Sequence, residues 1–312
     1  MDYLFLILGI AILLFSGEWL VRAGSSLAKH FKIPPFIIGV TIISFGTSAP
    51  ELFVSLSAAI NGNPDIALGN VIGSNIANIG LVLGITALII TIPISRQVIK
   101  FDYPVLLLSG VIFVIFMANL TVSRWEGFIM VLMMGIYIYL IIKNTKREEP
   151  VPAARKEKIP HPMGSLFIII LTCGGLLLGS NLLVDGASGI AKSWGVSERV
   201  ISISVIAVGT SLPELVTSVI AAIRKQLEIS IGNIIGSNIF NVLMIAGLSA
   251  MIKPLNVNPE IMKFDVYFFL GFAVLLGICF LPLKNPRINK WKGVIMLVSY
   301  LTYCILLFNL LS

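Results

Sequence analysis

Two glutamates stand in the setting that most favours chemistry in this sequence. Glu51 and Glu214 each lie in the middle of a long apolar run, within the repeated pattern Gly-Thr-Ser-x-Pro-Glu. An ionisable side chain deep inside a membrane costs roughly 2.5 kcal/mol or more, so such residues are rare and usually line a path for ions or substrates. Neither run contains Lys or Arg. The compensating charge is therefore expected to be a mobile cation or a proton.

Oxygen-bearing side chains recur around both glutamates and in the next apolar runs. They fall at steps of three or four residues, which places them on one face of each helix. The positions are Ser44, Thr47, Ser48 and Ser55 with Asn70, Ser74 and Asn78, and then Thr210, Ser211 and Ser218 with Asn233, Ser237 and Asn241. Four polar stripes avoid lipid most simply by facing one another. The pattern predicts a polar centre inside an apolar bundle.

Proline predicts a helix break beside each glutamate. Pro50 and Pro213 lack a backbone N–H and clash with the preceding turn, and a glycine four residues earlier loosens that turn. A break exposes backbone carbonyls, here near Ser44 and Ala207. Carboxylates, hydroxyls, amides and carbonyls are hard oxygen donors that suit Ca²⁺ and Na⁺. They do not suit zinc or copper, and no His or Cys lies nearby.

The chain repeats itself at an offset of 163 residues. Gly46–Ser55 matches Gly209–Ser218 at seven of ten positions, and Gly69–Asn78 matches Gly232–Asn241 at eight of ten. A match this long and this polar does not arise from low complexity. The sequence therefore predicts two copies of one structural unit.

Composition places the chain in a bilayer. Of 312 residues, 57% are hydrophobic and 12% charged, with a mean hydropathy of +0.99, whereas soluble domains carry about 25% charged residues. A helix crosses the hydrocarbon core with about 20 apolar residues. Ten runs qualify: 3–23, 36–60, 67–91, 103–121, 125–142, 165–187, 200–223, 229–251, 265–283 and 293–311. The runs are continuous rather than alternating, which excludes a membrane barrel. The first has no basic segment before it, so we expect a retained helix and not a signal peptide.

The net charge of +7 is explained by topology and not by nucleic acid. Lys and Arg favour cytoplasmic loops. With the N-terminus outside, most of the 22 basic residues fall in inner segments, including the polar linker 143–163. We therefore expect both termini to be extracellular and the linker to be cytoplasmic.

Five spans in each half force the second half to enter the membrane upside down. The predicted fold is all-α, with ten transmembrane helices in two inverted five-helix repeats, 1–142 and 164–312, joined by the linker 143–163. The repeated motifs occupy 39–80 and 202–243, and the second and seventh helices are broken at the centre.

Other residues have plainer interpretations. The pairs Gly69/Gly73 and Gly232/Gly236 match the G-x-x-x-G pattern of close helix packing. Glu18 lies near a span end without a repeat equivalent and is interpreted as accessory. Lastly, Asp102 and Asp265 are repeat equivalents at span boundaries, where we expect them to be solvated. The three cysteines lie far apart in apolar runs and are expected to be buried small hydrophobes.

At the two motif pairs, the sequence resembles the prokaryotic sodium/calcium exchangers of the cation/Ca²⁺ exchanger superfamily, over its whole length. The resemblance implies that the motif glutamates coordinate Ca²⁺ with hydroxyl and amide oxygens, and that backbone oxygens at Ser44 and Ala207 serve Na⁺. Carried over by position, the implied ligands are Thr47, Ser48, Glu51, Ser74, Asn78, Thr210, Ser211, Glu214, Ser237 and Asn241. It further implies a monomer without a prosthetic group, and no long cytoplasmic loop with Ca²⁺-sensing domains.

The expected function is secondary active exchange of Na⁺ for Ca²⁺ by alternating access, with the first and sixth helices sliding across the core. Some microbial relatives have Asp at the position of Asn241, so a Ca²⁺/H⁺ antiporter that uses the same carboxylates stays open. A passive cation channel is a further alternative. An enzyme such as an intramembrane protease is disfavoured, because no catalytic Asp pair or Ser–His dyad lies within the runs.

Overall fold

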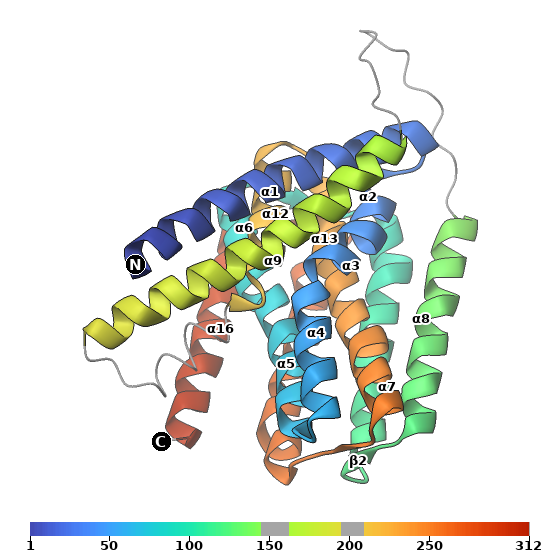
Figure 1. The fold of residues 1–312 in the computed structure, drawn as a ribbon. Helices are drawn as coiled ribbons and strands as arrows, with labels where there is room; N and C mark the ends of the chain where they lie inside the picture. The colour runs from blue at the N-terminus through green and yellow to red at the C-terminus, as the bar shows by residue number, and fades with distance from the viewer. Residues whose placement is uncertain (145–161, 195–208, 312) are drawn as a thin grey trace, which may run out of the picture. The chain divides into compact units, whose positions relative to one another are not determined.

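The computed structural model describes residues 1–144, 162–194 and 209–311 (Figure 1). The first half of the chain forms α1 (Asp2–Phe31), α2 (Pro35–Ile38), the π-helical turn η1 (Gly39–Ile43), α3 (Ser44–Thr47), α4 (Ala49–Ile60), α5 (Pro64–Ala77), η2 (Asn78–Leu83), α6 (Gly84–Ile89), β1 (Ile92–Pro93), η3 (Val98–Asp102), α7 (Tyr103–Met117), β2 (Thr121–Val122) and α8 (Arg124–Asn144). The second half forms α9 (Pro162–Ser193), α12 (Leu212–Ile223), α13 (Leu227–Phe240), η5 (Asn241–Ala246), α14 (Gly247–Ile252), β3 (Leu255–Asn256), η6 (Ile261–Asp265), α15 (Val266–Cys279), β4 (Arg287–Ile288) and α16 (Lys290–Leu311).

The sequence repeat is also a repeat of secondary structure. Adding 163 to the bounds of α5, η2, α6, β1 and η3 gives those of α13, η5, α14, β3 and η6. Even the π-helical turns recur, and such turns are uncommon and often mark functional sites. The expected repetition of one unit is therefore present along the described part of the chain.

Helix length and composition agree with a membrane protein. Eight described helical segments are long and apolar enough to cross a bilayer, and the bent pair Pro35–Thr47 and Ala49–Ile60 makes nine. The tenth expected span, 200–223, begins outside the described residues, and only α12 represents it. The Pro64–Ile89 and Leu227–Ile252 spans are the most shielded, with 72% and 83% of their most apolar stretch buried against 28–33% in the other six. Of the polar stripes expected on these two spans, Asn70 is half-buried and the other residues are buried, namely Ser74, Asn78, Asn233, Ser237 and Asn241.

The described residues divide into two compact units, and each unit combines segments from both sequence halves. One unit contains 1–49 and 139–236, and the other contains 50–138 and 237–312. The sequence halves are thus interleaved in the packing.

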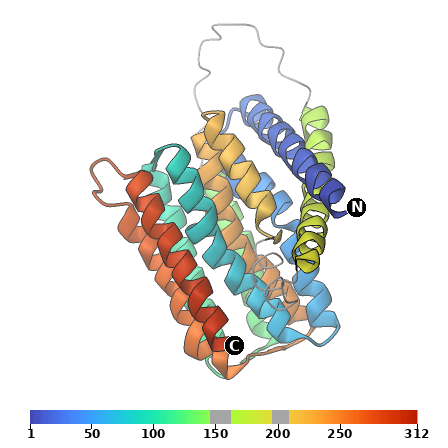
Figure 2. The same cartoon turned by 90° about the vertical axis from the view of Figure 1, so that its left-hand side faces the viewer.

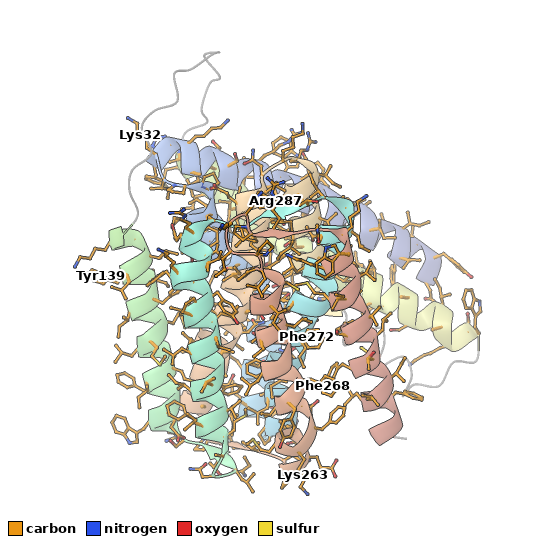
Figure 3. The ribbon with its side chains drawn as sticks, turned by 180° about the vertical axis from the view of Figure 1, so that it is seen from behind. Lys32, Tyr139, Lys263, Phe268, Phe272 and Arg287 are labelled. Atoms are coloured by element: carbon orange, nitrogen blue, oxygen red, sulfur yellow. The ribbon has the colours of Figure 1, made fainter. Side chains whose placement is uncertain are left out.

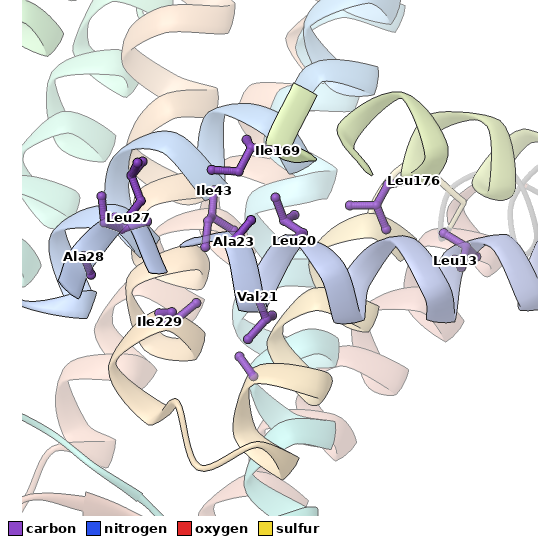
Figure 4. Packing of buried hydrophobic residues seen from close by; sticks show 12 residues of the cluster. Leu13, Leu20, Val21, Ala23, Leu27, Ala28, Ile43, Ile169, Leu176 and Ile229 are labelled. Atoms are coloured by element: carbon purple, nitrogen blue, oxygen red, sulfur yellow. The ribbon is translucent and has the colours of Figure 1, made fainter. Parts of the chain in front are cut away.

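The first unit is built on a long pairing of α1 with α9 (Figures 1 and 2). The start of α1 lies beside the end of α9, because a Cβ added at Gly186 would meet Asp2 and Leu6, whereas Ser26 near the end of α1 contacts Ser165 near the start of α9. The two helices are therefore antiparallel. Leu20, Ile43 and Leu176 belong to the buried apolar cluster that joins this pair to the rest of the unit (Figure 4).

The second unit contains strands that the sequence did not predict. Two-residue antiparallel ribbons join β1 to β4 and β2 to β3. Helix α16 packs along α6, and Gly84 permits close approach to Leu297 (Figure 2). On α15, Phe272 packs against Gly80, and the Phe268 ring lies 5.0 Å from that of Tyr303 (Figure 3).

Candidate functional site

The predicted helix break of the second span lies at Ser48, and in the seventh span α12 begins directly after the equivalent Ser211. In the second span, α3 ends at Thr47 and α4 begins at Ala49, with a bend of 48° between the two parts. Ser48 has φ −86° and ψ 11°, and Ser211, which immediately precedes α12, has φ −85° and ψ 2°. This sparsely populated backbone region is frequent in active sites. Each motif glutamate then follows in the first turn of the next helix, as the sequence predicted.

Glu214 lies in a polar cluster of the first unit that joins the two motifs. The Ser48 hydroxyl donates a 2.7 Å hydrogen bond to Glu214 Oε1, so a serine of the first motif contacts the glutamate of the second. Close by in sequence, the Thr47 hydroxyl donates to Asn233 Oδ1 at 3.0 Å, and Asn233 Nδ2 donates to Ser218 Oγ at 3.0 Å. All five side chains of this cluster are fully buried.

The equivalent cluster around Glu51 lies in the second unit. Asn70 Nδ2 donates to Ser55 Oγ at 2.9 Å and to the Glu51 carbonyl at 3.1 Å. The first of these bonds is the repeat equivalent of the bond from Asn233 to Ser218. Both motif carboxylates are fully buried, with 0% exposure. The structure therefore keeps two ionisable groups away from solvent among neutral hydroxyl and amide dipoles.

Two asparagines at π-helical turns are the clearest unsatisfied ligands. Asn78 begins η2 and Asn241 begins η5, and both side chains are buried. Neither the oxygen nor the nitrogen of either amide has a hydrogen-bond partner within the described residues. Burying an amide without partners costs several kcal/mol in an apolar medium, on the order of 2–7. A cation that accepts an amide oxygen as a ligand would offset part of that cost.

The remaining predicted residues differ in their surroundings. Ser74 and Ser237 are buried one turn before the unsatisfied asparagines, and the Ser211 hydroxyl is buried without a hydrogen-bond partner among the described residues. Thr210 is half-buried. The Ser44 carbonyl accepts hydrogen bonds from the Ser48 N–H at 3.0 Å and the Thr47 hydroxyl at 3.3 Å, so the break does not free it in this arrangement. Ala207 lies outside the described residues.

Two neighbours of the break escaped the sequence reasoning. A Cβ added at Gly46 would meet Cys173 Sγ, and the Ser180 hydroxyl donates to the Gly209 carbonyl at 2.5 Å. Both partners lie on α9, so this helix touches the break glycine of each motif. The spacing of the repeats does not predict these contacts, because the equivalent positions of α1 contain neither a cysteine nor a serine.

Asp102 corrects an expectation. It is fully buried, not solvated, and Asp102 Oδ1 accepts a 2.8 Å hydrogen bond from the Tyr137 hydroxyl. Its equivalent, Asp265, is half-buried and accepts a 2.9 Å bond from Tyr303. Each aspartate ends a π-helical turn at the head of its helix, where the packing of the following span encloses it. Glu18, in the middle of α1, forms ion pairs with Arg22 on the same helix and with Arg224, which directly follows α12.

The donor set is one of hard, mostly neutral oxygens. Among the described residues no group of three or more His, Cys, Asp and Glu side chains gathers. Hydroxyls and amides therefore outnumber charged ligands around each glutamate. Such a set suits Ca²⁺ or Na⁺ more than a transition metal.

Comparison with known proteins agrees with this chemistry. The model of the family described as "Sodium/calcium exchanger protein" matches residues 1–143 and 164–309. Inner membrane protein YrbG of Escherichia coli is 31% identical over 97% of this chain and 95% of its own length, and sodium/calcium exchanger MaX1 of Methanosarcina acetivorans is 29% identical over 98% of each. Among solved structures, the sodium-calcium exchanger NCX_Mj superposes with a TM-score of 0.82 at 31% identity, over 96% of each chain.

Proposed function

This chain belongs to the sodium/calcium exchanger protein family, and from that membership we propose that it is a secondary active antiporter that exchanges Na⁺ for Ca²⁺ across the membrane by alternating access. We place the transported ions at Glu51 and Glu214, in the middle of the membrane. The further ligands in this proposal are Thr47, Ser48, Ser74, Asn78, Thr210, Ser211, Ser237 and Asn241, with backbone oxygens of Ser44 and Ala207 for Na⁺.

The observation that carries the proposal is the hydrogen bond from Ser48 to Glu214. It joins the motif of the first half to the carboxylate of the second, as a shared ion site requires. The unsatisfied amides of Asn78 and Asn241 support it independently, because they offer buried oxygens with no other described partner. Ca²⁺ takes six to eight oxygen ligands, more than two carboxylates supply. Neutral hydroxyls and amides complete such a shell without adding charge.

Charge compensation explains why exchange is obligatory. Two ionised carboxylates leave an empty site with a charge of about −2, which is costly to move through hydrocarbon. Ca²⁺ or Na⁺ ions neutralise that charge, so the filled states change conformation and the empty one does not. An ion shifts the equilibrium only through its different affinity for the two conformations. No covalent chemistry is involved, and the protein acts as a transporter.

An inverted repeat would supply the two conformations. Two features support it. The first helix of each half, α1 and α9, are antiparallel neighbours, and the pairing of β1 with β4 becomes that of β3 with β2 when the halves are exchanged. We propose that α1 and α9 slide together as the moving pair. In this proposal both termini are extracellular, the linker 143–163 is cytoplasmic, and the protein works as a monomer.

Uptake of ⁴⁵Ca²⁺ into proteoliposomes tests this function. Vesicles loaded with Na⁺ should take up Ca²⁺ faster than vesicles with equal Na⁺ on both sides. Glu51→Gln should abolish the difference, because the amide keeps the shape of the side chain and removes its charge. Glu260→Gln is the matched control, since Glu260 is exposed and lies outside the motifs.

Each outcome separates the alternatives. Uptake that follows a pH gradient and ignores Na⁺ would establish the Ca²⁺/H⁺ antiporter instead. Flux without any counter-ion would indicate a channel. Na⁺-driven uptake that persists in Glu51→Gln would refute the site while leaving exchange intact.

A further inference from the structure

An ion pair ties the proposed moving helix to the helix that carries Glu214. Glu18 of α1 accepts from Arg224 through both of its oxygens, at 2.6 Å from Nη2 to Oε1 and 2.9 Å from Nε to Oε2. Paired, parallel contacts of this kind are the strongest geometry available to arginine and a carboxylate. All of these residues belong to the first unit. The contact is therefore a property of one compact body.

The pair continues a close contact between α1 and α12. A Cβ added at Gly17, the residue before Glu18, would lie 3.0 Å from the side chains of Val216 and Ile220. Arg224 directly follows the last residue of α12, ten residues after Glu214. A shift of α1 by one helical turn, about 5.4 Å, would move the Glu18 carboxylate out of hydrogen-bonding distance of Arg224. The pair can exist only in one arrangement of these helices.

The other half of the chain lacks this pair. At the offset of 163, the position of Glu18 corresponds to Asn181 and that of Arg224 to Asn61. The Asn61 side chain donates instead to Ser57 within its own segment. If the two halves of an inverted repeat exchange roles, the opposite arrangement places Asn181 and Asn61 where Glu18 and Arg224 are here. Two neutral amides then replace the salt bridge.

We propose that Glu18 and Arg224 are positioning residues that bias the exchanger toward the arrangement seen here, through an ion pair that its opposite conformation cannot form. The inference rests on the proposed function. Arg22 also contacts Glu18, with Nε at 2.5 Å from Oε1, but it lies one turn along the same helix and moves with it. Arg22 therefore cannot discriminate between arrangements, which makes it the matched control.

The bias is measured as a ratio of apparent affinities at the two membrane faces. Half-saturating Ca²⁺ is determined in right-side-out and in inverted membrane vesicles that contain the full chain. Apparent affinity falls with the population of the competent conformation. Weakening one arrangement should therefore raise half-saturating Ca²⁺ at one face and lower it at the other. We expect Glu18→Gln and Arg224→Gln each to change the ratio by about two- to fivefold, as befits a partly exposed pair.

The double variant and the control decide the result. Glu18→Gln combined with Arg224→Gln should change the ratio no more than either substitution alone, because both remove the same pair. Arg22→Gln should leave it unchanged. A ratio unmoved by Glu18→Gln and Arg224→Gln, or moved equally by Arg22→Gln, would overturn the inference.

A second measurement does not depend on transport. Hydrogen–deuterium exchange of the full chain in nanodiscs should show faster exchange at residues 17–24 and 212–224 in Glu18→Gln and Arg224→Gln than in wild type or Arg22→Gln. Equal hydrogen–deuterium exchange in all four proteins would refute the role of the ion pair, even if the wild type transported Ca²⁺ against Na⁺. Conversely, a wild type that moves no Ca²⁺ but shows this exchange pattern would refute the proposed function and keep the pair.

Discussion

The two copies of the sequence Gly-Asn-x-Ile-Gly-Ser-Asn-Ile differ in their contacts with the described residues. In α13, a Cβ added at Gly232 would lie 2.7 Å from the Phe36 carbonyl oxygen, and one at Gly236 would lie 2.6 Å from that of Val40. In α5, a Cβ at Gly69 or at Gly73 would meet no described atom within 4 Å. The G-x-x-x-G interpretation is thus confirmed for the second copy, and among described residues the first copy shows no such contact.

This difference separates what a repeat determines from what it leaves free. Local sequence sets helices and π-helical turns, and these recur in the described parts of both copies. The tightness of the packing depends on which residues face each glycine pair. At the offset of 163, the equivalents of Phe36 and Val40 are Arg199 and Ile203, which lie outside the described residues. Substitutions at equivalent positions separate the properties that are equal in the two copies from those that are not.

The carboxylates are expected to be equal, and their loss gives the largest effect. Glu51→Gln and Glu214→Gln should each weaken Ca²⁺ binding at least about 30-fold, since removing one member of a buried charge pairing costs about 2–5 kcal/mol. Isothermal titration of the purified protein measures this. Glu260→Gln, an exposed position, should bind like wild type. Strong loss in only one of the two motif variants would break the equivalence of the halves.

The glycines are expected to be unequal. Gly236→Ala forces a Cβ against backbone and should lower the free energy of unfolding by about 1–3 kcal/mol. Gly73→Ala should leave stability unchanged or raise it by up to about 1 kcal/mol, because alanine favours helix. Thermal unfolding in detergent compares the two.

Transport sharpens this comparison of glycines. If a segment packs against Gly73 during the transport cycle, Gly73→Ala should slow Na⁺-driven Ca²⁺ uptake although the protein is stable. A variant that is both stable and fully active would show that no segment approaches Gly73 closely during transport.

The sequence predicts the helices and the break in the second span, but not which helices contact one another. The spacing of Ser48 and Glu51, with proline between them, predicts a broken helix with both side chains near the break, and the structure places them there. The same spacing cannot show that Ser48 donates to Glu214, 166 residues away. Packing between distant parts of the chain decides which helices face each other. The helical spacing of polar residues does not contain this information.

Asp102 is a second case in which the sequence did not predict the packing partner. Its position at a span boundary indicated solvent, because hydropathy alone locates the edge of an apolar run. Burial depends on Tyr137, which lies on the following helix and donates to the carboxylate. The two-residue strands were missed for a related reason, since a pair of residues has no period to detect.

The repeat-equivalent asparagines Asn233 and Asn70 should differ moderately in how much they contribute to the free energy of unfolding. Asn233→Ala removes a fully buried amide that serves Thr47 and Ser218, and should cost about 1–3 kcal/mol of unfolding free energy because both partners stay buried. Asn70→Ala removes a half-buried amide and should cost about 1 kcal/mol. Chemical denaturation measures both. Equal costs would mean that the two clusters are more alike than their burial indicates.

The tyrosine–aspartate pairs give the smallest difference. Tyr137→Phe removes the donor to the fully buried Asp102, and Tyr303→Phe removes the donor to the half-buried Asp265. Water can replace the lost donor only where the carboxylate is accessible, so the first substitution should lower unfolding free energy by about 1–3 kcal/mol and the second by about 1 kcal/mol or less. Both tyrosine rings also stack on the phenylalanine that precedes each aspartate, and phenylalanine preserves that contact. Any difference between the variants therefore reports the hydrogen bond alone, and equal losses would place both aspartates in equally dry surroundings.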